Sequence, residues 1–187
     1  MQLIVGLGNP GPAYEKTRHN AGFWFLDNLA SRYNCTFKVE KRFSGRVAAF
    51  SSVESGWLFC PTTFMNLSGQ AVQAISQFYR ISPQHILVAH DDLDLPVGDV
   101  RLKMSGGHGG HNGLRDIIQR LGTNAFARLR IGIGHPGNKE EVHNYVLGNP
   151  RSSEREAILK GLENAMDVMD KVLAGDFQKA MTLLNTR

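Results

Sequence analysis

The stretch Ile86-Leu87-Val88-Ala89-His90-Asp91-Asp92 decides which fold we expect for this chain. Its four apolar residues are typical of a buried strand, and Ser82-Pro83 separates them from a preceding helical pattern. Three polar residues follow directly at the carboxyl end, where functional side chains gather in α/β sheets. The stretch therefore predicts an α/β protein with a functional site beyond this strand.

Similar patterns extend in both directions. Leu3-Ile4-Val5 reads as a second buried strand, and hairpin-like runs lie near residues 36–41, 46–53 and 57–60. Further strands are expected at 100–104 and 126–134. Helical spacing predicts helices at 20–33, 114–121, 155–174 and 177–184, and a further helix that ends at about residue 80. Ser153 and Glu156 are expected to form a capping box for the helix over 155–174. This order predicts an α/β fold with a twisted mixed β-sheet flanked by helices.

Length and composition limit the architecture. With 187 residues and 42% hydrophobic content, the chain can bury one substantial core, so we expect a single domain over residues 1–187. No run approaches the roughly 20 apolar residues of a membrane span, and the N-terminus lacks the basic lead of a secretory signal. Cys35 and Cys60 lie far apart and indicate neither a disulfide framework nor a metal site. We expect a soluble cytoplasmic protein without a membrane partner.

Charge is distributed unevenly along the chain. Residues 1–130 hold 14 basic and 9 acidic side chains, whereas residues 131–187 hold 7 and 8. Such an asymmetry favours a polyanionic partner, because phosphate contacts are largely electrostatic. The net charge of +4 alone is equally typical of a mildly basic protein with solvated lysines.

The stretch Gly6-Leu7-Gly8-Asn9-Pro10-Gly11 formally matches the G-x-G-x-x-G fingerprint of dinucleotide-binding proteins. That fingerprint needs glycines that open a helix, whereas Pro10 and Pro12 prolong a loop and the helical pattern starts only near Asn20. We interpret the glycines as turn formers and expect no dinucleotide. The stiff loop can instead present Asn9, whose amide both donates and accepts hydrogen bonds.

His19 ends that loop, beside Asn20, which is a reasonable helix N-cap. A histidine here can be an ordinary surface residue, but Asp91 is a candidate to orient its imidazole and stabilise the protonated form. Spacing leaves this dyad as one pairing among several, because the chain has seven histidines. Asp91, Asp92 and Asp94 could also bind a hard cation. However, Asp91 and Asp92 would point to opposite faces of a strand, and the turn predicted after them favours a structural role for Asp92 or Asp94.

The segment from Ser105 to Gly113 carries five glycines in nine residues ahead of a helix. Glycines at that density let backbone approach a ligand, and the helix N-terminus favours an anion, although the lysine and hydroxyl of a P-loop are absent. Zinc binding through His108 and His111 lacks further ligands. A flexible surface loop is the alternative, and we favour a mobile lid over a substrate.

Two further groups of residues are candidates for binding a substrate. Phe64, Met65 and Asn66 follow a strand and precede a helix, and core packing explains the first two more often than binding does. The two strands that flank the glycine-rich loop carry four basic residues: Arg101, Lys103, Arg128 and Arg130. On one face these side chains could grip phosphate, whereas on an exposed edge they would be solvated.

Taken together, these segments resemble the bacterial-type peptidyl-tRNA hydrolase family from Leu3 to about Leu147. Five motifs occur in order, VGLGNPG, RHNAG, PTTFMNLSG, HDDLDLP and GGHGGHNGLRD, and RLRIGIG follows them. Each motif alone is weak evidence, but their joint order and spacing are specific. The resemblance implies hydrolysis of the ester that links a peptide to the 3′ end of tRNA, which recycles tRNA from peptidyl-tRNA released by stalled ribosomes.

The resemblance also implies roles for individual residues. His19 matches the catalytic base, Asp91 the carboxylate that supports it, and Asn9 a cleft amide tied to discrimination between blocked and free aminoacyl-tRNA. The residues implied to contact the substrate and its tRNA are Tyr14, Phe64, Met65, Asn66, His111 and Asn112, with Lys103 and Arg130 as a clamp for the tRNA 5′ phosphate. The family implies peptidyl-tRNA as partner, no metal, no organic cofactor and a monomer.

Two other functions remain open from the sequence. One is an RNA-binding protein on this scaffold that does not hydrolyse esters, which a salt-sensitive RNA complex without cleavage would favour. The other is a nucleotide-dependent oxidoreductase, which rests on the first glycine motif alone.

Overall fold

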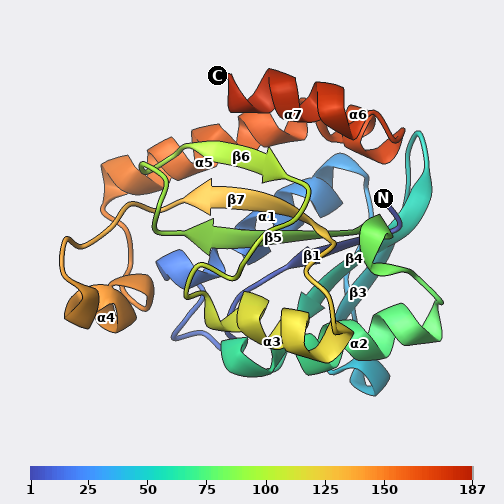
Figure 1. The fold of residues 1–187 in the computed structure, drawn as a ribbon, viewed down its shortest axis with the longest axis horizontal. Coiled ribbons are helices and arrows are strands. Elements are labelled where there is room, and N and C mark those ends of the chain that lie inside the picture. The colour runs from blue at the N-terminus through green and yellow to red at the C-terminus, as the bar shows by residue number, and fades with distance from the viewer. Residues whose placement is uncertain (187) are drawn as a thin grey trace.

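A seven-stranded mixed sheet organises residues 1–186, the part of the chain that this computed structural model describes (Figure 1). The strands are β1 (Leu3–Gly6), β2 (Lys38–Glu40), β3 (Gly45–Ser51), β4 (Ser55–Pro61), β5 (Ile86–Asp92), β6 (Val100–Lys103) and β7 (Ala127–Gly132). Their spatial order is β2-β3-β4-β1-β5-β7-β6. β4, β1, β5 and β7 run parallel to one another, whereas β2, β3 and β6 pair antiparallel with their neighbours. The predicted mixed α/β sheet is confirmed.

Helices cover both faces of this sheet. One face packs against α1 (Ala21–Arg32), α5 (Ser152–Met166), α6 (Met169–Leu173) and α7 (Phe177–Asn185), and the other against α2 (Ser68–Phe78) and α3 (Asn112–Leu121). α4 (Val142–Val146) packs beside η1 (Arg18–Asn20), a short 3-10 turn, and a second such turn, η3 (Met65–Leu67), precedes α2. Among the described residues, no helix combines the length and apolar character needed to cross a membrane.

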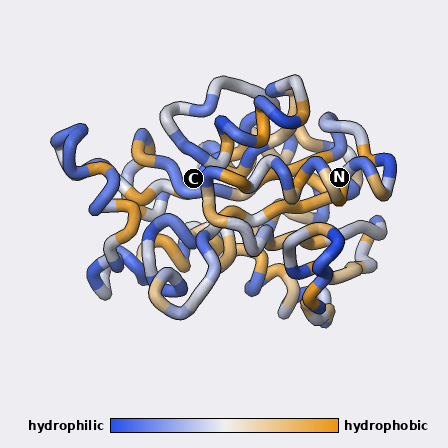
Figure 2. Tube along the Cα trace, turned by 90° about the horizontal axis from the view of Figure 1, so that it is seen from below, coloured by the Kyte–Doolittle hydropathy of each residue, from blue (hydrophilic) through white to orange (hydrophobic). Residues whose placement is uncertain are grey.

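The central strand β5 is apolar throughout its first half because both of its faces are covered. Leu87 and Ala89 belong to the core beneath α1, whereas Ile86 and Val88 belong to the core beneath α2 and α3. Continuous apolar runs of this kind are typical of strands buried in parallel sheets. Figure 2 shows the hydrophobic segments running through the interior and the hydrophilic ones around them.

Two glycines let α1 lie unusually close to the sheet. A Cβ atom on Gly22 would stand 2.4 Å from the carbonyl oxygen of Ala89 and 2.5 Å from the amide nitrogen of Leu7. A Cβ atom on Gly6 would stand 2.4 Å from the carbonyl oxygen of Gly22. Side chains at either position would push α1 away, so these glycines bring the start of α1 against the ends of β1 and β5.

The C-terminal region differs from the sequence expectation. The helix predicted over 155–174 is divided into α5 and α6, which lie on either side of residues 167–168. The residue pattern does not mark this break, because the buried apolar positions 158, 162, 165, 169 and 172 keep helical spacing across it. The predicted capping box of Ser153 and Glu156 is also wrong: α5 begins at Ser152, and the Glu154 carboxylate accepts a hydrogen bond from the Arg151 amide at 2.7 Å.

Candidate active site

Loops from three neighbouring parallel strands meet at one edge of the sheet. β4, β1 and β5 lie side by side, so their carboxyl ends share this edge. Asn9 follows β1 and Met65 follows β4. Asp91 is the penultimate residue of β5 itself. The carboxyl edge of parallel strands is where α/β proteins place ligands, which agrees with the location expected from β5.

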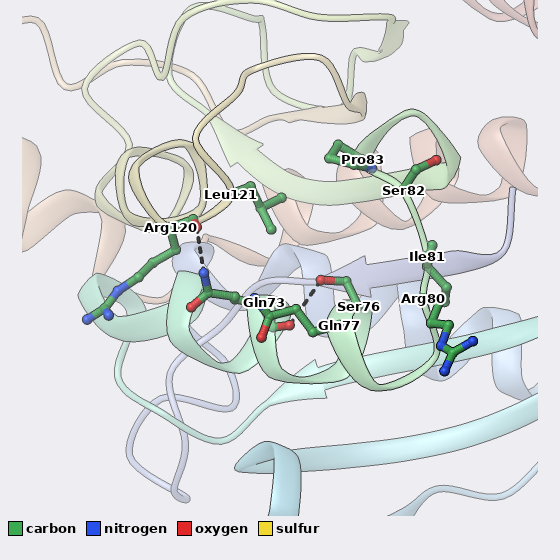
Figure 3. A pocket seen from close by; sticks show the side chains of 9 residues that line it. All are labelled: Gln73, Ser76, Gln77, Arg80, Ile81, Ser82, Pro83, Arg120 and Leu121. Atoms are coloured by element: carbon green, nitrogen blue, oxygen red, sulfur yellow. Dashed lines mark hydrogen bonds between the residues drawn. The ribbon is translucent and has the colours of Figure 1, made fainter.

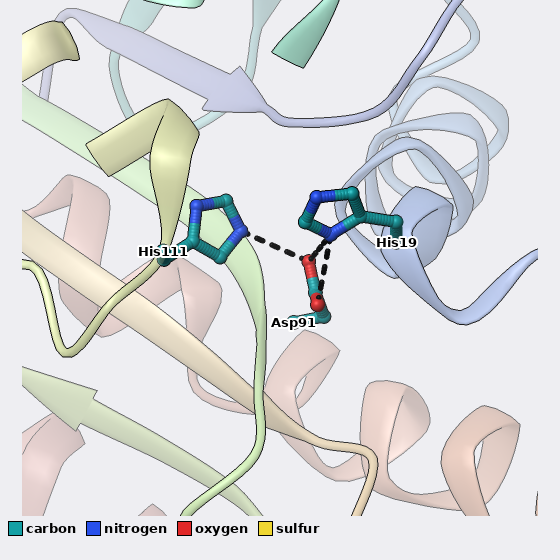
Figure 4. A group of neighbouring side chains, drawn as sticks. All are labelled: His19, Asp91 and His111. Carbon is teal, nitrogen blue, oxygen red and sulfur yellow. Dashed lines mark hydrogen bonds and ion pairs between the residues drawn. The ribbon is translucent and has the colours of Figure 1, made fainter. Parts of the chain in front are cut away.

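Asp91 is the centre of a buried polar cluster (Figure 4). The Nδ1 atom of His19 lies 2.8 Å from Oδ1 and 3.0 Å from Oδ2 of this carboxylate. From the opposite side, Nε2 of His111 lies 3.0 Å from the same Oδ1 atom. The two imidazole rings are 5.0 Å apart. The expected pairing of His19 with Asp91 is thus present, and a second histidine shares the carboxylate.

Hydrogen bonds fix the proton positions on both imidazoles. Nδ1 of His111 accepts bonds from the amides of Gly113 and Leu114 at the start of α3, at 3.1 and 3.3 Å, so its proton is on Nε2 and is donated to Asp91. Because an ionised carboxylate only accepts, Nδ1 of His19 also carries a proton. Nε2 of His19 is then the nitrogen with a free lone pair, because both hydrogen bonds of this imidazole with the described residues are made by Nδ1.

Burial and neighbouring charges shift the pKa of Asp91, of His19 and of the adjacent His90. Burial alone would raise the pKa of Asp91, but the charges and hydrogen bonds of His19 and His111 outweigh it and hold the pKa well below its usual range. Burial disfavours the charged form of His19, but Asp91 more than compensates and raises the pKa of the imidazole above 6.5. Burial and the neighbouring His111 lower the pKa of His90 to about 4.

The same three side chains have the composition of a metal site, since their potential ligand atoms lie within 4.8 Å of one another. The proton arrangement does not fit that use. A metal ion would need the lone pair of Nε2 of His111, but this nitrogen is protonated as long as Nδ1 caps α3. Metal binding would therefore break two hydrogen bonds to the helix amides, and the cluster suits proton chemistry better than coordination.

Asn9 lies in a second network that joins the loop after β1 to the loop after β4. Its Oδ1 atom accepts a bond from the Met65 amide at 2.8 Å, so its amide nitrogen faces the opposite way and makes no hydrogen bond with the described residues. The Asn20 side chain makes two hydrogen bonds to the Asn9 backbone. Its Oδ1 atom accepts from the Asn9 amide at 2.8 Å, and its Nδ2 atom donates to the Asn9 carbonyl at 3.0 Å. Asn20 occupies the N-cap position of α1, as expected, but its side chain makes no cap bond because it holds the loop after β1.

Arg18 anchors the turn that carries His19. Its guanidinium makes a 2.8 Å ion pair with Glu154 at the start of α5, donates to the Tyr145 carbonyl at 3.2 Å, and stacks on the Tyr145 ring at 4.1 Å. These partners lie 127 and 136 residues away in the chain. The sequence gives no signal for these contacts, because an arginine beside a loop is ordinarily solvated.

Most of the other substrate-contact candidates are more exposed than the cluster, and Met65 is the exception. Tyr14 and Phe64 face each other edge to face, with ring centres 6.3 Å apart, although they follow different strands. Asn66 is exposed on η3 and Asn112 is exposed in the first turn of α3, where it accepts a bond from Arg115 at 3.1 Å. Met65 is buried, as core packing predicts, with its backbone amide used by Asn9.

The four basic residues of β6 and β7 share one face of the sheet, because Arg101 pairs with Arg130 and Lys103 with Arg128 across the antiparallel ladder. Of the four, only Arg101 and Lys103 are exposed. Arg130 donates to Asp92 at 2.7 Å, and Arg128 is buried beneath the glycine-rich loop. The hypothesis that all four grip phosphate is therefore too broad, and Lys103 has the freest side chain among them.

Asp92 and Asp94 do not join Asp91 in a cation site. Asp92 points to the opposite face of β5 and bonds Arg130, and its other oxygen accepts from the Asp94 amide at 2.9 Å in a turn. The structural role predicted for Asp92 is confirmed, and Asp94 contributes its backbone amide to the turn. The first glycine motif likewise leads into an irregular loop rather than a helix, since helical structure starts at Arg18. Cys60 is buried, which raises the pKa of its thiol to about 12, as expected of a packing residue.

A separate hollow lies at the far edge of the sheet (Figure 3). It is lined by Gln73, Ser76, Gln77, Arg80, Ile81, Ser82, Pro83, Arg120 and Leu121. These residues end α2 and α3 and precede the first residue of β5, whereas Asp91 is near its last. Figure 3 shows the side chains of Arg80 and Arg120 directed away from the hollow. This hollow contains no residue of the candidate site.

Comparisons with known proteins agree with this geometry. Residues 3–187 match the family model described as peptidyl-tRNA hydrolase. The chain is 54% identical over 185 residues to a protein of Methylococcus capsulatus named peptidyl-tRNA hydrolase, covering 99% of both, and 53% identical over 186 residues to one of Coxiella burnetii, covering 100% of this chain and 98% of the relative.

A solved structure gives the same result. The crystal structure of peptidyl-tRNA hydrolase from Acinetobacter baumannii superposes with a TM-score of 0.97 at 47% sequence identity, covering 99% of this chain and 94% of that one. The match includes the parallel strands and loops that bring the His19, Asp91 and Asn9 segments together. This chain therefore belongs to the peptidyl-tRNA hydrolase family of enzymes.

Proposed function

We propose that this protein hydrolyses the ester bond between a peptide and the 3′ end of its tRNA, with His19 as general base. The observation that carries the proposal is the buried pair of His19 and Asp91, in which Nδ1 is bound to the carboxylate and Nε2 makes no hydrogen bond with the described residues. An imidazole held in this way is suited to take a proton from water.

The first step is attack by water on the ester carbonyl. Nε2 of His19 removes a proton from the water as its oxygen bonds to the carbonyl carbon, and Asp91 stabilises the imidazolium that results. The raised pKa of His19 expresses the same stabilisation. General-base assistance of this kind accelerates a reaction by about 10²–10⁴-fold.

The second step breaks the tetrahedral adduct. The proton on Nε2 passes to the departing 3′ oxygen of the terminal ribose, so that free tRNA and a peptide carboxylic acid leave. Asn9 stabilises the negative charge that develops on the carbonyl oxygen, because its amide nitrogen is free of other partners while its oxygen is fixed by Met65. No covalent enzyme intermediate is needed for an activated ester.

The surrounding residues supply the contacts with the substrate. Tyr14 and Phe64, whose rings pack edge to face, bind the tRNA end, and the exposed amides of Asn66 and Asn112 hold the peptide beside the buried Met65. His111 contributes through Asp91 rather than through tRNA.

Lys103 and Arg130 take the 5′ phosphate. They lie on the same face of adjacent strands, and phosphate favours cationic donors. The biological consequence of this activity is recycling of tRNA from peptidyl-tRNA that stalled ribosomes release.

The test is release of N-acetyl-amino acid from N-acetyl-aminoacyl-tRNA in water enriched in oxygen-18, with unblocked aminoacyl-tRNA as control. We expect rapid release from the blocked substrate alone, with the heavy oxygen in the released acid and none in the tRNA. Binding of tRNA without release would contradict the proposal and favour an RNA-binding protein without hydrolytic activity.

A further inference from the structure

Arg128 is a buried cation without an anionic partner. It lies in β7 with 2% of its surface exposed, and its guanidinium makes no ion pair with the described residues. Instead Nη1 donates to the carbonyl oxygen of Gly107 and Nη2 to that of Gly106, while the guanidinium stacks on the Phe126 ring at 4.7 Å. Its Nε atom has no hydrogen-bond partner within residues 1–186.

The neighbours of Arg128 make its burial more costly. Lys103 stands directly opposite on β6, and Arg130 lies two residues along β7 on the same face. The one carboxylate in this group, Asp92, is bonded to Arg130. Burial and then the charge of Arg130 lower the pKa of Arg128. Buried charges are ordinarily paired, so the two loop carbonyls are the main compensation for this one.

Those carbonyls belong to the glycine-rich loop that leads into the candidate site. The loop has backbone conformations open mainly to glycine, with φ of 148° at Gly106, 55° at Gly109 and 82° at Gly110. Such residues have little preference of their own, so external contacts must select one conformation. A side chain on Gly106 would stand 3.0 Å from Nζ of Lys103, so the loop also packs against that ammonium group.

The far end of the loop is His111. A bond from its amide to the His108 carbonyl, at 2.8 Å, closes a turn, and its imidazole spans the start of α3 and the Asp91 carboxylate. Only three residues separate Gly107 from His111. The position of the carbonyls held by Arg128 therefore limits where the His111 ring can lie.

We propose that Arg128 is a positioning residue, whose two-pronged guanidinium holds the glycine-rich loop so that His111 reaches Asp91. The proposal rests on the proposed function, and it explains what holds the His111 imidazole against the Asp91 carboxylate. The fork of the guanidinium is what matters, because it donates to two consecutive carbonyls in parallel, which the single ammonium of lysine does not reproduce. Arg128 touches neither the dyad nor the ester.

The test compares Arg128→Lys, which keeps the charge, with Arg128→Met, which keeps most of the stem, and with Arg101→Met as a control. Arg101 lies on the same face of the antiparallel pair β6–β7, is exposed, and pairs with Asp99 rather than with the carbonyls of Gly106 and Gly107. For each variant, kcat and KM on N-acetyl-aminoacyl-tRNA are measured, together with the downfield imidazole N–H resonances of His19 and His111 in proton NMR.

We expect both Arg128 variants to lose the His111 resonance and about 10-fold or more in kcat, since misplacement of about 1 Å near a reacting centre costs up to about 10²-fold. KM should rise in Arg128→Met and change little in Arg128→Lys, whereas Arg101→Met should keep both kcat and the resonance. A lysine variant with wild-type kcat and an intact His111 resonance would overturn the proposal, since charge alone would then suffice.

Two further outcomes are also decisive. If neither Arg128 variant folds, as judged by thermal unfolding, the contact is purely structural and the proposal fails. If the wild-type protein releases no product, the proposed hydrolysis fails, but the His111 resonance still reports whether Arg128 positions the loop.

Discussion

Replacement of Asp91 by asparagine removes the negative charge while changing the shape of the side chain very little. In the native cluster Oδ1 accepts from both histidines, at 2.8 and 3.0 Å, and Oδ2 lies 3.0 Å from Nδ1 of His19. Asparagine keeps one acceptor oxygen and places an amide donor at the other position. The change therefore weakens two charge-assisted hydrogen bonds and leaves a donor facing the Nδ1 proton of His19.

The size of the effect follows from these contacts. A hydrogen bond to a charged group contributes about 1.5–3 kcal/mol, and loss of this stabilisation for the imidazolium in the transition state slows kcat by about 10- to 150-fold. Asp91 also raises the pKa of His19, so its removal lowers that pKa, and the acidic limb of kcat/KM moves to lower pH. Slower turnover should thus accompany activity that persists to lower pH.

The assay is the pH dependence of N-acetyl-aminoacyl-tRNA hydrolysis, followed for the wild type, Asp91→Asn and Asp94→Asn. Asp94 is exposed, loses the same charge on substitution and lies three residues away, so its variant should behave as wild type. An acidic limb that stays in place in Asp91→Asn would refute the reasoning, even if the rate fell.

Three further predictions test other parts of the site. Asn9→Asp keeps the acceptor for the Met65 amide but replaces the free donor by a carboxylate oxygen, so kcat should fall by about 10²-fold or more in single-turnover assays, with little change in tRNA affinity. Gly22→Ala should lower the free energy of unfolding in urea by about 1–3 kcal/mol or more, because its Cβ meets backbone at 2.4 Å, whereas Gly107→Ala, with open space around it, should not. Wild-type kcat/KM should rise with pH through the pKa of His19, which lies above 6.5, because only the neutral imidazole is a base; a pH-independent profile from 5 to 9 would contradict this.

The strands and the carboxyl-edge site could be predicted because they depend on local patterns. The apolar run before His90 marks the end of one strand, and the glycines and proline after Val5 mark the end of another. Both signals are local and do not depend on the rest of the chain. Parallel neighbours then bring those ends together. The resemblance of the motifs supplied the roles of His19, Asp91 and Asn9, which spacing alone left open among seven histidines.

The contacts that organise the site could not be predicted because they join distant positions. Asn20 looks like a helix cap in sequence, since nothing local shows that its amide will meet the Asn9 backbone. His111 lies 20 residues from Asp91, and the only partner that the sequence suggested for it was the nearby His108. Arg128 alternates with apolar residues like a solvated strand arginine, and only the fold of the glycine-rich loop buries it.

The most direct test of the account is single-turnover hydrolysis of N-acetyl-aminoacyl-tRNA by His19→Ala, measured beside tRNA binding by the same variant. Because Nε2 of His19 is assigned as the base that activates water, we predict a loss of about 10²-fold or more in the rate of ester cleavage while tRNA affinity stays within a few fold of wild type. A variant that cleaves at a near wild-type rate would contradict the central claim that this imidazole activates the attacking water.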